Sequence, residues 1–184
     1  MRTFLALELN EAARSEVARV QKVLAATLDG LRWVRPDLVH ITLRFLGELD
    51  PGDVTPLSRE VAQEVAGQEP FEARLETLGS FPPRGRARVV WVGVGAGSEP
   101  MGGLADRVTA ALARFGLPRD RRPFSPHVTL GRARRGPVST APLAALKVIP
   151  TPFPVERVTL FESRLSPRGP KYYPLARFDL GATL

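Results

Sequence analysis

The sequence contains no cysteine, which excludes disulfide bonds, thiolate metal ligands and a cysteine nucleophile. A chain without cysteine also suits a reducing compartment. No stretch approaches the roughly 18 consecutive apolar residues of a membrane span. The opening segment MRTFLALELN has too short an apolar run for a signal peptide, and Glu8 interrupts it. We therefore expect a cytoplasmic protein that does not associate with a membrane.

Lysine is also scarce, so arginine supplies almost all of the positive charge. The 26 basic residues exceed the 19 acidic ones, and the formal net charge is +7. The planar guanidinium group suits phosphate better than an ammonium group does. This balance favours a polyanionic partner. A GC-rich genome or a heat-adapted host would produce the same preference for arginine, and composition alone does not separate these explanations.

Strands and amphipathic helices alternate along the 184 residues, which indicates an α+β or α/β fold. Apolar residues at helical spacing predict helices, the first with Asn10 as its N-cap, and β-rich runs predict strands. The expected helices cover residues 11–28, 53–66 and 101–115, with a short one within 137–147. The expected strands cover residues 4–9, 39–46, 71–78, 87–94, 127–133, 155–162 and 172–178.

A weak internal repeat relates the two halves of the chain. The segment WVRPDLVHITLRFLG resembles RPFSPHVTLGRAR, and the histidines of the two segments are 87 residues apart. No linker is long or polar enough to separate independent domains. We therefore expect residues 1–184 to form a single bilobal domain with an internal pseudo-repeat.

The only two histidines of the chain both occur in the pattern H-x-T-L, at residues 40–43 and 127–130. Threonine occurs 11 times, so the chance that both histidines have threonine two residues later is roughly one in 280. Residues two apart in a strand share a face and lie about 6.6 to 7 Å apart. His40 and Thr42 should therefore share one face, as should His127 and Thr129, while the residues between and after them enter the core.

Such a pair of motifs suits phosphodiester chemistry. A neutral imidazole can deprotonate an attacking water while a second, protonated imidazole supplies a proton to the leaving oxygen. The threonine hydroxyls can donate hydrogen bonds to the phosphate oxygens on which charge accumulates. This chemistry needs neither a metal nor a cofactor, and no carboxylate cluster lies near a histidine at ligand spacing. The alternative is that each His-Thr pair is only a hydrogen-bonded feature of a half-exposed strand.

The sequence resembles the bacterial RNA 2',3'-cyclic phosphodiesterases, also called 2'-5' RNA ligases, of the two-histidine phosphoesterase superfamily. The resemblance covers nearly the whole chain, through RTFLALEL, RWVRPDLVHITLRFLGE, LGSFPPRGRARVVWVGV, RPFSPHVTLGRAR and VTLFESRLSPRGPKYYPLARF. It implies a bilobal α+β fold with two pseudo-symmetric lobes, in which antiparallel sheets line a central cleft and helices pack outside. It further implies that His40 is the proton donor and His127 the proton acceptor.

Two arginines are candidate substrate-binding residues. Arg132 matches an arginine that the family places near the phosphate. Strict alternation would turn its side chain away from His127, unless Gly131 marks a β-bulge that redirects it; otherwise Arg132 is a surface charge. Arg44 lies four residues after His40, so strict alternation places both side chains on the same face of the strand. Alternatively, Arg44 lies at the rim of the cleft.

Aromatic residues near the motifs have two interpretations. Phe45 and Leu46 are interpreted as core residues rather than as a surface for base stacking. Four other rings could stack a nucleobase, although packing is the favoured interpretation for each: Trp33, Trp91, Phe124 and Tyr172.

The resemblance and the motifs together predict hydrolysis of an RNA-terminal 2',3'-cyclic phosphate to a 2'-phosphomonoester, with 2'-5' ligation as the reverse activity. The expected partner is RNA with such an end, for example a tRNA-half-like fragment, and the protein is expected to be a monomer. One alternative is a hydrolase of 2',5'-phosphodiesters or small cyclic nucleotides. Another is an RNA- or nucleotide-binding module without turnover.

Overall fold

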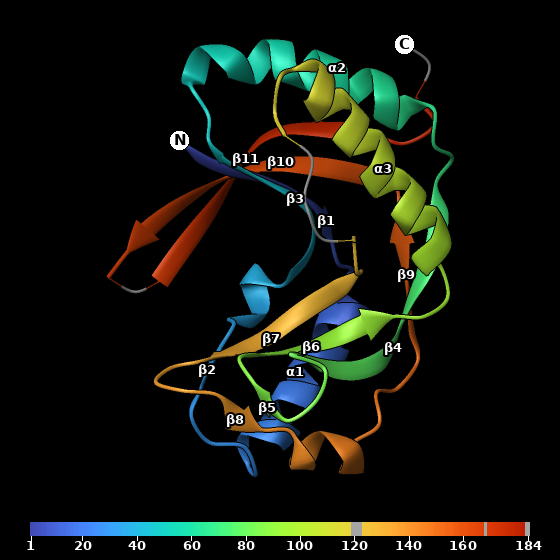
Figure 1. The fold of residues 1–184 in the computed structure, drawn as a ribbon. Helices are drawn as coiled ribbons and strands as arrows, with labels where there is room; N and C mark the ends of the chain where they lie inside the picture. The colour runs from blue at the N-terminus through green and yellow to red at the C-terminus, as the bar shows by residue number, and fades with distance from the viewer. Residues whose placement is uncertain (119–122, 168, 183–184) are drawn as a thin grey trace.

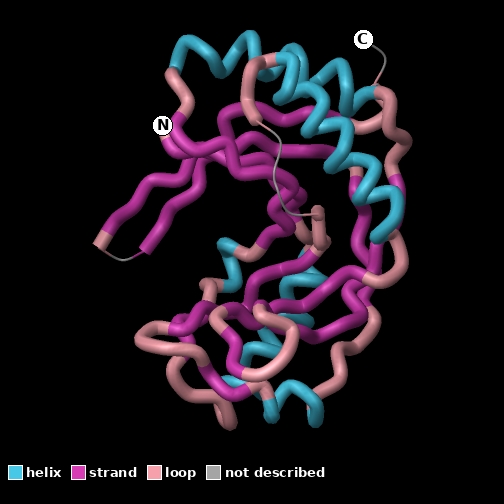
Figure 2. The backbone as a smooth tube through the Cα atoms, in the orientation of Figure 1, coloured by secondary structure: helices cyan, strands magenta, loops and turns pink. Residues whose placement is uncertain are grey.

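A computed structural model describes residues 1–118, 123–167 and 169–182 of the chain. In these residues a single antiparallel sheet of nine strands curls upon itself, and three α-helices pack against it (Figures 1 and 2). The expected α+β class is confirmed. The helices are α1 (Glu11–Ala25), α2 (Val54–Ala66) and α3 (Ser98–Arg114). The sheet strands are β1 (Arg2–Glu8), β2 (Leu31–Trp33), β3 (His40–Glu48), β4 (Phe71–Phe81), β6 (Val89–Val94), β7 (His127–Ala133), β9 (Thr151–Val155), β10 (Arg157–Ser166) and β11 (Gly169–Asp179).

The strand order divides the sheet into two matching halves. The order is β11-β10-β1-β3-β7-β6-β4-β9, and β2 pairs additionally with β7. We call β11, β10, β1 and β3 the first half, and β7, β6, β4 and β9 with β2 the second half. In the described residues, β3 and β7 are joined by one residue pair, Ile41 opposite Val128. The two expected lobes are thus joined edge to edge in one sheet.

Helices α1 and α3 each follow a strand of one half of the sheet and pack against the other half. Helix α1 follows β1 but packs on β7 and β9, whereas α3 follows β6 but packs beside β3 and α2 (Figure 1). The helices are amphipathic, and their apolar stripes are buried: Val17, Val20 and Leu24 of α1 are fully shielded from solvent. Asn10 caps α1 as expected, because its side-chain oxygen accepts from the backbone N–H of Ala13 at 2.9 Å. Each of the three helices thus buries its apolar stripe inside the molecule.

Several local expectations were wrong in detail. Residues 155–162 are not one strand, because β9 ends at Val155 and β10 begins at Arg157. Strand β9 was not predicted. It tolerates Pro152 and Pro154 because it is an edge strand, paired in the described residues with β4 alone. The short helix expected within residues 137–147 is present as the 3-10 helix η3 (Ala141–Ala145), and β8 (Val138–Ser139) precedes it.

Short elements near the motifs complete the fold. Residues 87–94 are divided between β6 and β5 (Arg86–Ala87), and β5 pairs with β8 in a separate two-stranded ribbon. The 3-10 helices η1 (Pro36–Leu38) and η2 (Pro51–Asp53) precede β3 and α2. No helix in the described part of the chain is both long enough and apolar enough to cross a membrane.

Candidate active site

The register of the sheet places the two H-x-T-L motifs side by side. Ile41 of the first motif lies opposite Val128 of the second in an antiparallel pair. One step along the strands in either direction, this register sets His40 beside Thr129 and Thr42 beside His127. The four candidate catalytic side chains therefore gather on one face of two neighbouring strands, although they come from opposite halves of the chain.

Burial confirms the predicted alternation within each motif. Ile41, Val128 and Leu130 are fully buried, and Leu43 is 6% exposed. The histidines and threonines between them are only partly buried. The core therefore holds the apolar residues of both motifs and turns the four polar side chains to the opposite face.

A β-bulge lies at the last residue of each motif. Thr42 pairs with Ala6 and Arg44 pairs with Leu5, so Leu43 is an extra residue in β3. In β7, Thr129 pairs with Trp91 and Gly131 pairs with Val90, so Leu130 is the extra residue. At a bulge, the side chains of two consecutive residues point to the same side of the strand. The alternation of side chains beyond the bulge is therefore shifted by one residue. The fifth residue after each histidine, Phe45 or Arg132, then returns to the side of the histidines.

The bulges determine the sides of the strands to which Arg132 and Arg44 point. The redirection expected near Gly131 is present, and the charge of Arg132 acts on both His40 and His127. The prediction that Arg44 shares the face of His40 was wrong, because the bulge at Leu43 turns its side chain inward. Arg44 is 6% exposed and donates a hydrogen bond to the carbonyl of Pro118, beyond α3.

A buried glutamine supports the bulge in β7. The Nε2 group of Gln21, on α1, donates to the carbonyl of the extra residue Leu130 at 2.9 Å and to that of Val34 at 2.7 Å. The backbone N–H of Val34 also donates to the carbonyl of Leu130 at 2.8 Å. These bonds satisfy a carbonyl that the bulge displaces from the ladder, and so α1 helps to fix the position of Arg132.

Both imidazole rings are oriented by the same local contact. The Nδ1 atom of His40 lies 2.8 Å from the carbonyl oxygen of Leu38, and Nδ1 of His127 lies 2.7 Å from that of Ser125. A carbonyl can only accept, so each Nδ1 carries a proton and donates it. The proton that changes during catalysis must therefore be carried on Nε2 of each ring. Nε2 of His40 lies 3.0 Å from the hydroxyl of Thr42.

Aromatic rings enclose each histidine in a matching way. Tyr172 meets His40 edge to face with ring centroids 5.3 Å apart, and Phe4 lies 4.9 Å from the same ring. Phe81 meets His127 edge to face at 5.0 Å, and Trp91 lies 6.0 Å away. Of the four proposed stacking rings, Trp91 and Tyr172 thus lie at the site, whereas Trp33 and Phe124 pack against the core.

The prediction that Phe45 belongs to the core was wrong. Its ring is 57% exposed, because the bulge at Leu43 turns it out of the interior. Its centroid lies 5.9 Å from that of Phe4, the ring that also contacts His40. Leu46, by contrast, is partly buried and packs against the core as expected.

Burial and nearby positive charge act in the same direction on both histidines. Burial lowers the pKa of His40, the hydrogen bond to Leu38 opposes this shift, and the charges of Arg132 and His127 lower the pKa further. The pKa of His127 is also lowered, first by burial and then by Arg132, against the hydrogen bond to Ser125. Burial raises the pKa of the Tyr172 hydroxyl, with Arg132 and Arg2 opposing. The site thus favours neutral imidazoles until an anion arrives.

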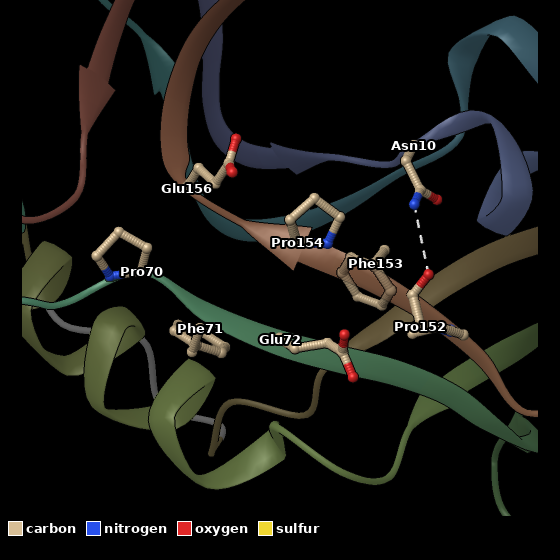
Figure 3. Close-up of a pocket in the computed structure, with 8 residues that line it drawn as sticks. All are labelled: Asn10, Pro70, Phe71, Glu72, Pro152, Phe153, Pro154 and Glu156. Atoms are coloured by element: carbon tan, nitrogen blue, oxygen red, sulfur yellow. Dashed lines mark hydrogen bonds between the residues drawn. The ribbon is translucent and has the colours of Figure 1, made fainter.

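A hollow elsewhere in the molecule has different chemistry. It has a volume of about 450 Å³ and lies where β9 meets β4 and residue Asn10, far along the strand order from β3 (Figure 3). Phe71 and Phe153 contribute to its lining, as do the carboxylates Glu72 and Glu156. Carboxylates repel a phosphate, so this hollow is not suited to an anionic substrate. In the part of the chain that the structure describes, no three acidic or histidine side chains are grouped to hold a metal ion.

Several residues that shape the site were not predicted from the sequence. Phe4 was predicted only as a strand residue, and Phe81 was placed between the expected strands 71–78 and 87–94, although both lie in segments that carry the family resemblance. Gln21 gave no signal beyond its place on α1. The carbonyls of Leu38 and Ser125 were not considered, and their only signal is that each lies two residues before a histidine.

A curled antiparallel sheet with two apposed His-x-Thr motifs is the architecture of the two-histidine phosphoesterases. The family model of the 2'-5' RNA ligase superfamily matches residues 8–166 of the chain. The RNA 2',3'-cyclic phosphodiesterase of Methanothermobacter thermautotrophicus is 33% identical over 185 residues, which cover 98% of this chain and 99% of that protein. The chain therefore belongs to the 2'-5' RNA ligase superfamily.

Further relatives and solved structures agree with this assignment. The RNA 2',3'-cyclic phosphodiesterase of Geobacillus stearothermophilus is 33% identical over 179 residues, and these cover 96% of this chain but 56% of that protein. A protein of Thermus thermophilus has a crystal structure that superimposes with a TM-score of 0.82 at 30% identity, covering 98% of both chains. The structure of Escherichia coli LigT complexed with 3'-AMP gives 0.77 at 28% identity, with the same coverage.

Proposed function

We propose that this protein hydrolyses a 2',3'-cyclic phosphate at the end of an RNA strand, using His40 and His127 as an acid/base pair. The observation that carries the proposal is the register of Ile41 with Val128, which brings both motifs to one face. The names of the relatives support the substrate class. The bonded Nδ1 groups support the chemistry, because they leave both Nε2 atoms to exchange protons.

Each histidine carries out one of the two proton transfers of the reaction. Neutral His127 accepts a proton from water through Nε2 while the water oxygen forms a bond to phosphorus. The bond from phosphorus to O3' breaks, and protonated His40 donates its Nε2 proton to O3'. The product carries the phosphate on O2'. The roles of donor and acceptor rest on the family resemblance, because the two histidines are positioned alike.

Other groups act on the charge that develops on the phosphate. The hydroxyls of Thr42 and Thr129 donate to the non-bridging oxygens, and the guanidinium of Arg132 neutralises part of the added charge. All of these groups come from one chain, so we propose that a monomer is active and needs no metal. An RNA 5'-hydroxyl in place of the water would give a 2'-5' linkage with the same acid and base.

The test is hydrolysis of a short oligonucleotide that ends in a 2',3'-cyclic phosphate. Wild-type protein should release the monoester, and His40→Ala and His127→Ala should not do so at a comparable rate. Binding without turnover by the wild-type protein would instead identify a nucleotide-binding module. Equal turnover by both variants would show that other residues carry the chemistry.

A further inference from the structure

Seven arginines in the described residues form ion pairs, and five of those that do not are gathered at one end of the sheet. The paired ones are Arg19, Arg35, Arg74, Arg114, Arg157, Arg164 and Arg177. In the described residues, no carboxylate pairs with Arg32, Arg84, Arg88, Arg134 or Arg135, and all five are exposed. We call these five residues the arginine edge.

The fold gathers the arginine edge at one end of the second half of the sheet. Strand β5 pairs with β8, which joins the turn that holds Arg84 to the turn that holds Arg134 and Arg135 (Figure 1). The carbonyl of Arg88 accepts from the N–H of Ala133, and the N–H of Arg134 donates to the carbonyl of Gly30, just before β2. These backbone contacts bring segments that are distant in the sequence to one end of the second half of the sheet.

The sequence around four of the five arginines supplies no counter-charge. Residues 77–98 and 123–155, which contain β5 to β8 and most of the arginine edge, include no aspartate or glutamate. Asp29, next to Gly30, is the acidic residue nearest to Arg32 along the chain, and in the described residues no ion pair joins it to the arginine edge. A surface of this kind attracts a polyanion.

One pair of arginines joins this edge to the candidate active site. Arg32 in β2 lies directly opposite Arg132 in β7. Directly opposed residues of antiparallel strands point to the same face, and like charges in such positions destabilise a sheet. The fold gains no stability from this pair of like charges, whereas an anion bound between or beside the two guanidinium groups would be stabilised by both.

We propose that the arginine edge binds the backbone phosphates of the RNA strand that leads to the terminal cyclic phosphate. The inference rests on the proposed function and extends it by naming the surface that binds the strand beyond its terminal phosphate. A cyclic mononucleotide has one phosphate, which the histidines and Arg132 hold. The further guanidinium groups beyond Arg132 suit the further phosphates of a longer strand. The strand would run from His127 past Arg132 and Arg32 toward Arg134.

The test compares two triple variants of equal net charge. Arg84→Gln/Arg134→Gln/Arg135→Gln removes three charges from the edge. Arg86 is left unchanged, because its Nε donates to the carbonyl of Pro137 at 2.9 Å. Lys22→Gln/Arg59→Gln/Lys147→Gln removes three exposed charges that lie on α1, on α2 and in the loop before β9. Binding of a fluorescent ten-nucleotide RNA that ends in a 2'-phosphate is measured by anisotropy over a series of salt concentrations.

The edge variant should weaken binding of this RNA by about tenfold or more near 0.1 M salt. Its slope of log affinity against log salt should fall by about 2, since each phosphate contact on a single strand contributes about 0.7. The control variant should bind as the wild type does. Hydrolysis of a cyclic mononucleotide should change by less than about twofold in both variants, because its single phosphate does not reach the edge.

Equal weakening by both triple variants would overturn the proposal, since net charge alone would then explain the binding. No weakening by either would overturn it too, and so would equal losses on the mononucleotide and the RNA. Because binding is measured without turnover, a wild-type protein that binds the RNA but hydrolyses nothing would refute the proposed function alone. Arg32→Gln provides a second readout: it should weaken RNA binding without lowering Tm, because it removes a like-charge pair.

Discussion

Ile41 and Val128 lie opposite each other and are the point at which the two halves of the sheet meet. Each is the residue between a histidine and a threonine of one motif. The same pair that closes the sheet therefore sets the geometry of the candidate active site. The two fully buried side chains hold the strands together on one face while the four polar side chains gather on the other.

The first prediction concerns the histidines. His40→Ala and His127→Ala should each lower kcat by about 10²-fold or more, which is the scale of general acid–base catalysis. The double variant should lose little more than either single variant, because the two residues act as one unit. Steady-state rates and unchanged circular dichroism spectra are the measurements. Two independent, multiplying losses would argue against a concerted pair.

The second prediction concerns the threonines. Thr42→Val and Thr129→Val keep the side-chain shape but remove the hydroxyl, and each should lower kcat by about tenfold or more. Thr55→Val, at an exposed position of α2, is the matched control and should retain the wild-type rate. A wild-type rate in both motif variants would remove the hydroxyls from the mechanism.

The third prediction is a pH profile that depends on Arg132. Wild-type kcat/KM should follow a bell with its centre below about 6.5, the ordinary pKa of histidine, because burial and Arg132 lower the pKa of both rings. Below the lower limb both rings are protonated and the base is lost; above the upper limb both are neutral and the acid is lost. The limbs belong to the pair rather than to either ring.

Arg132→Gln should move both limbs to higher pH, because its charge no longer opposes protonation of His40 and His127. It should also lower kcat/KM by about tenfold at the optimum through loss of a phosphate contact. The profile is measured on a cyclic mononucleotide, with Arg59→Gln as the control. Limbs that stay in place or move to lower pH would show that Arg132 does not act on the histidines.

The fourth prediction concerns the glutamine that supports the bulge in β7. Gln21→Leu removes the donors to the carbonyls of Leu130 and Val34 and should lower the free energy of unfolding by about 1–3 kcal/mol. Because the bulge directs Arg132, kcat/KM should fall as well, and Gln21→Glu should not restore it, since a carboxylate cannot donate. Lower stability with an unchanged pH profile would limit Gln21 to a structural role.

The geometry within each motif could be predicted from the sequence, because side chains in a strand alternate between its two faces and this alternation depends only on neighbouring residues. The sides taken by His40 and Thr42 follow from the apolar residues between them, and the same holds for His127 and Thr129. The pairing of Ile41 with Val128 could not be derived, since it joins segments 87 residues apart and depends on how the whole sheet closes.

The two bulges explain why Arg132 lies on the side of the histidines and Arg44 does not. Gly131 gave a signal for an irregularity in β7, and the redirection of Arg132 was anticipated. Nothing at Leu43 gave a similar signal, so strict alternation placed Arg44 at the site and Phe45 in the core. The structure reverses both positions. A single extra residue is enough to exchange the two faces of a strand.

The most direct test of the two-histidine account is the product formed from an oligonucleotide with a 2',3'-cyclic phosphate end, followed by phosphorus NMR in the presence of EDTA. The account predicts complete hydrolysis, since the acid, the base and the hydrogen-bond donors are all side chains. It predicts a 2'-phosphate, because His40 protonates O3' as it leaves and His127 activates the water on the opposite side of phosphorus. A predominant 3'-phosphate would contradict the assigned roles, and loss of activity that a divalent ion restores would contradict the metal-independent mechanism.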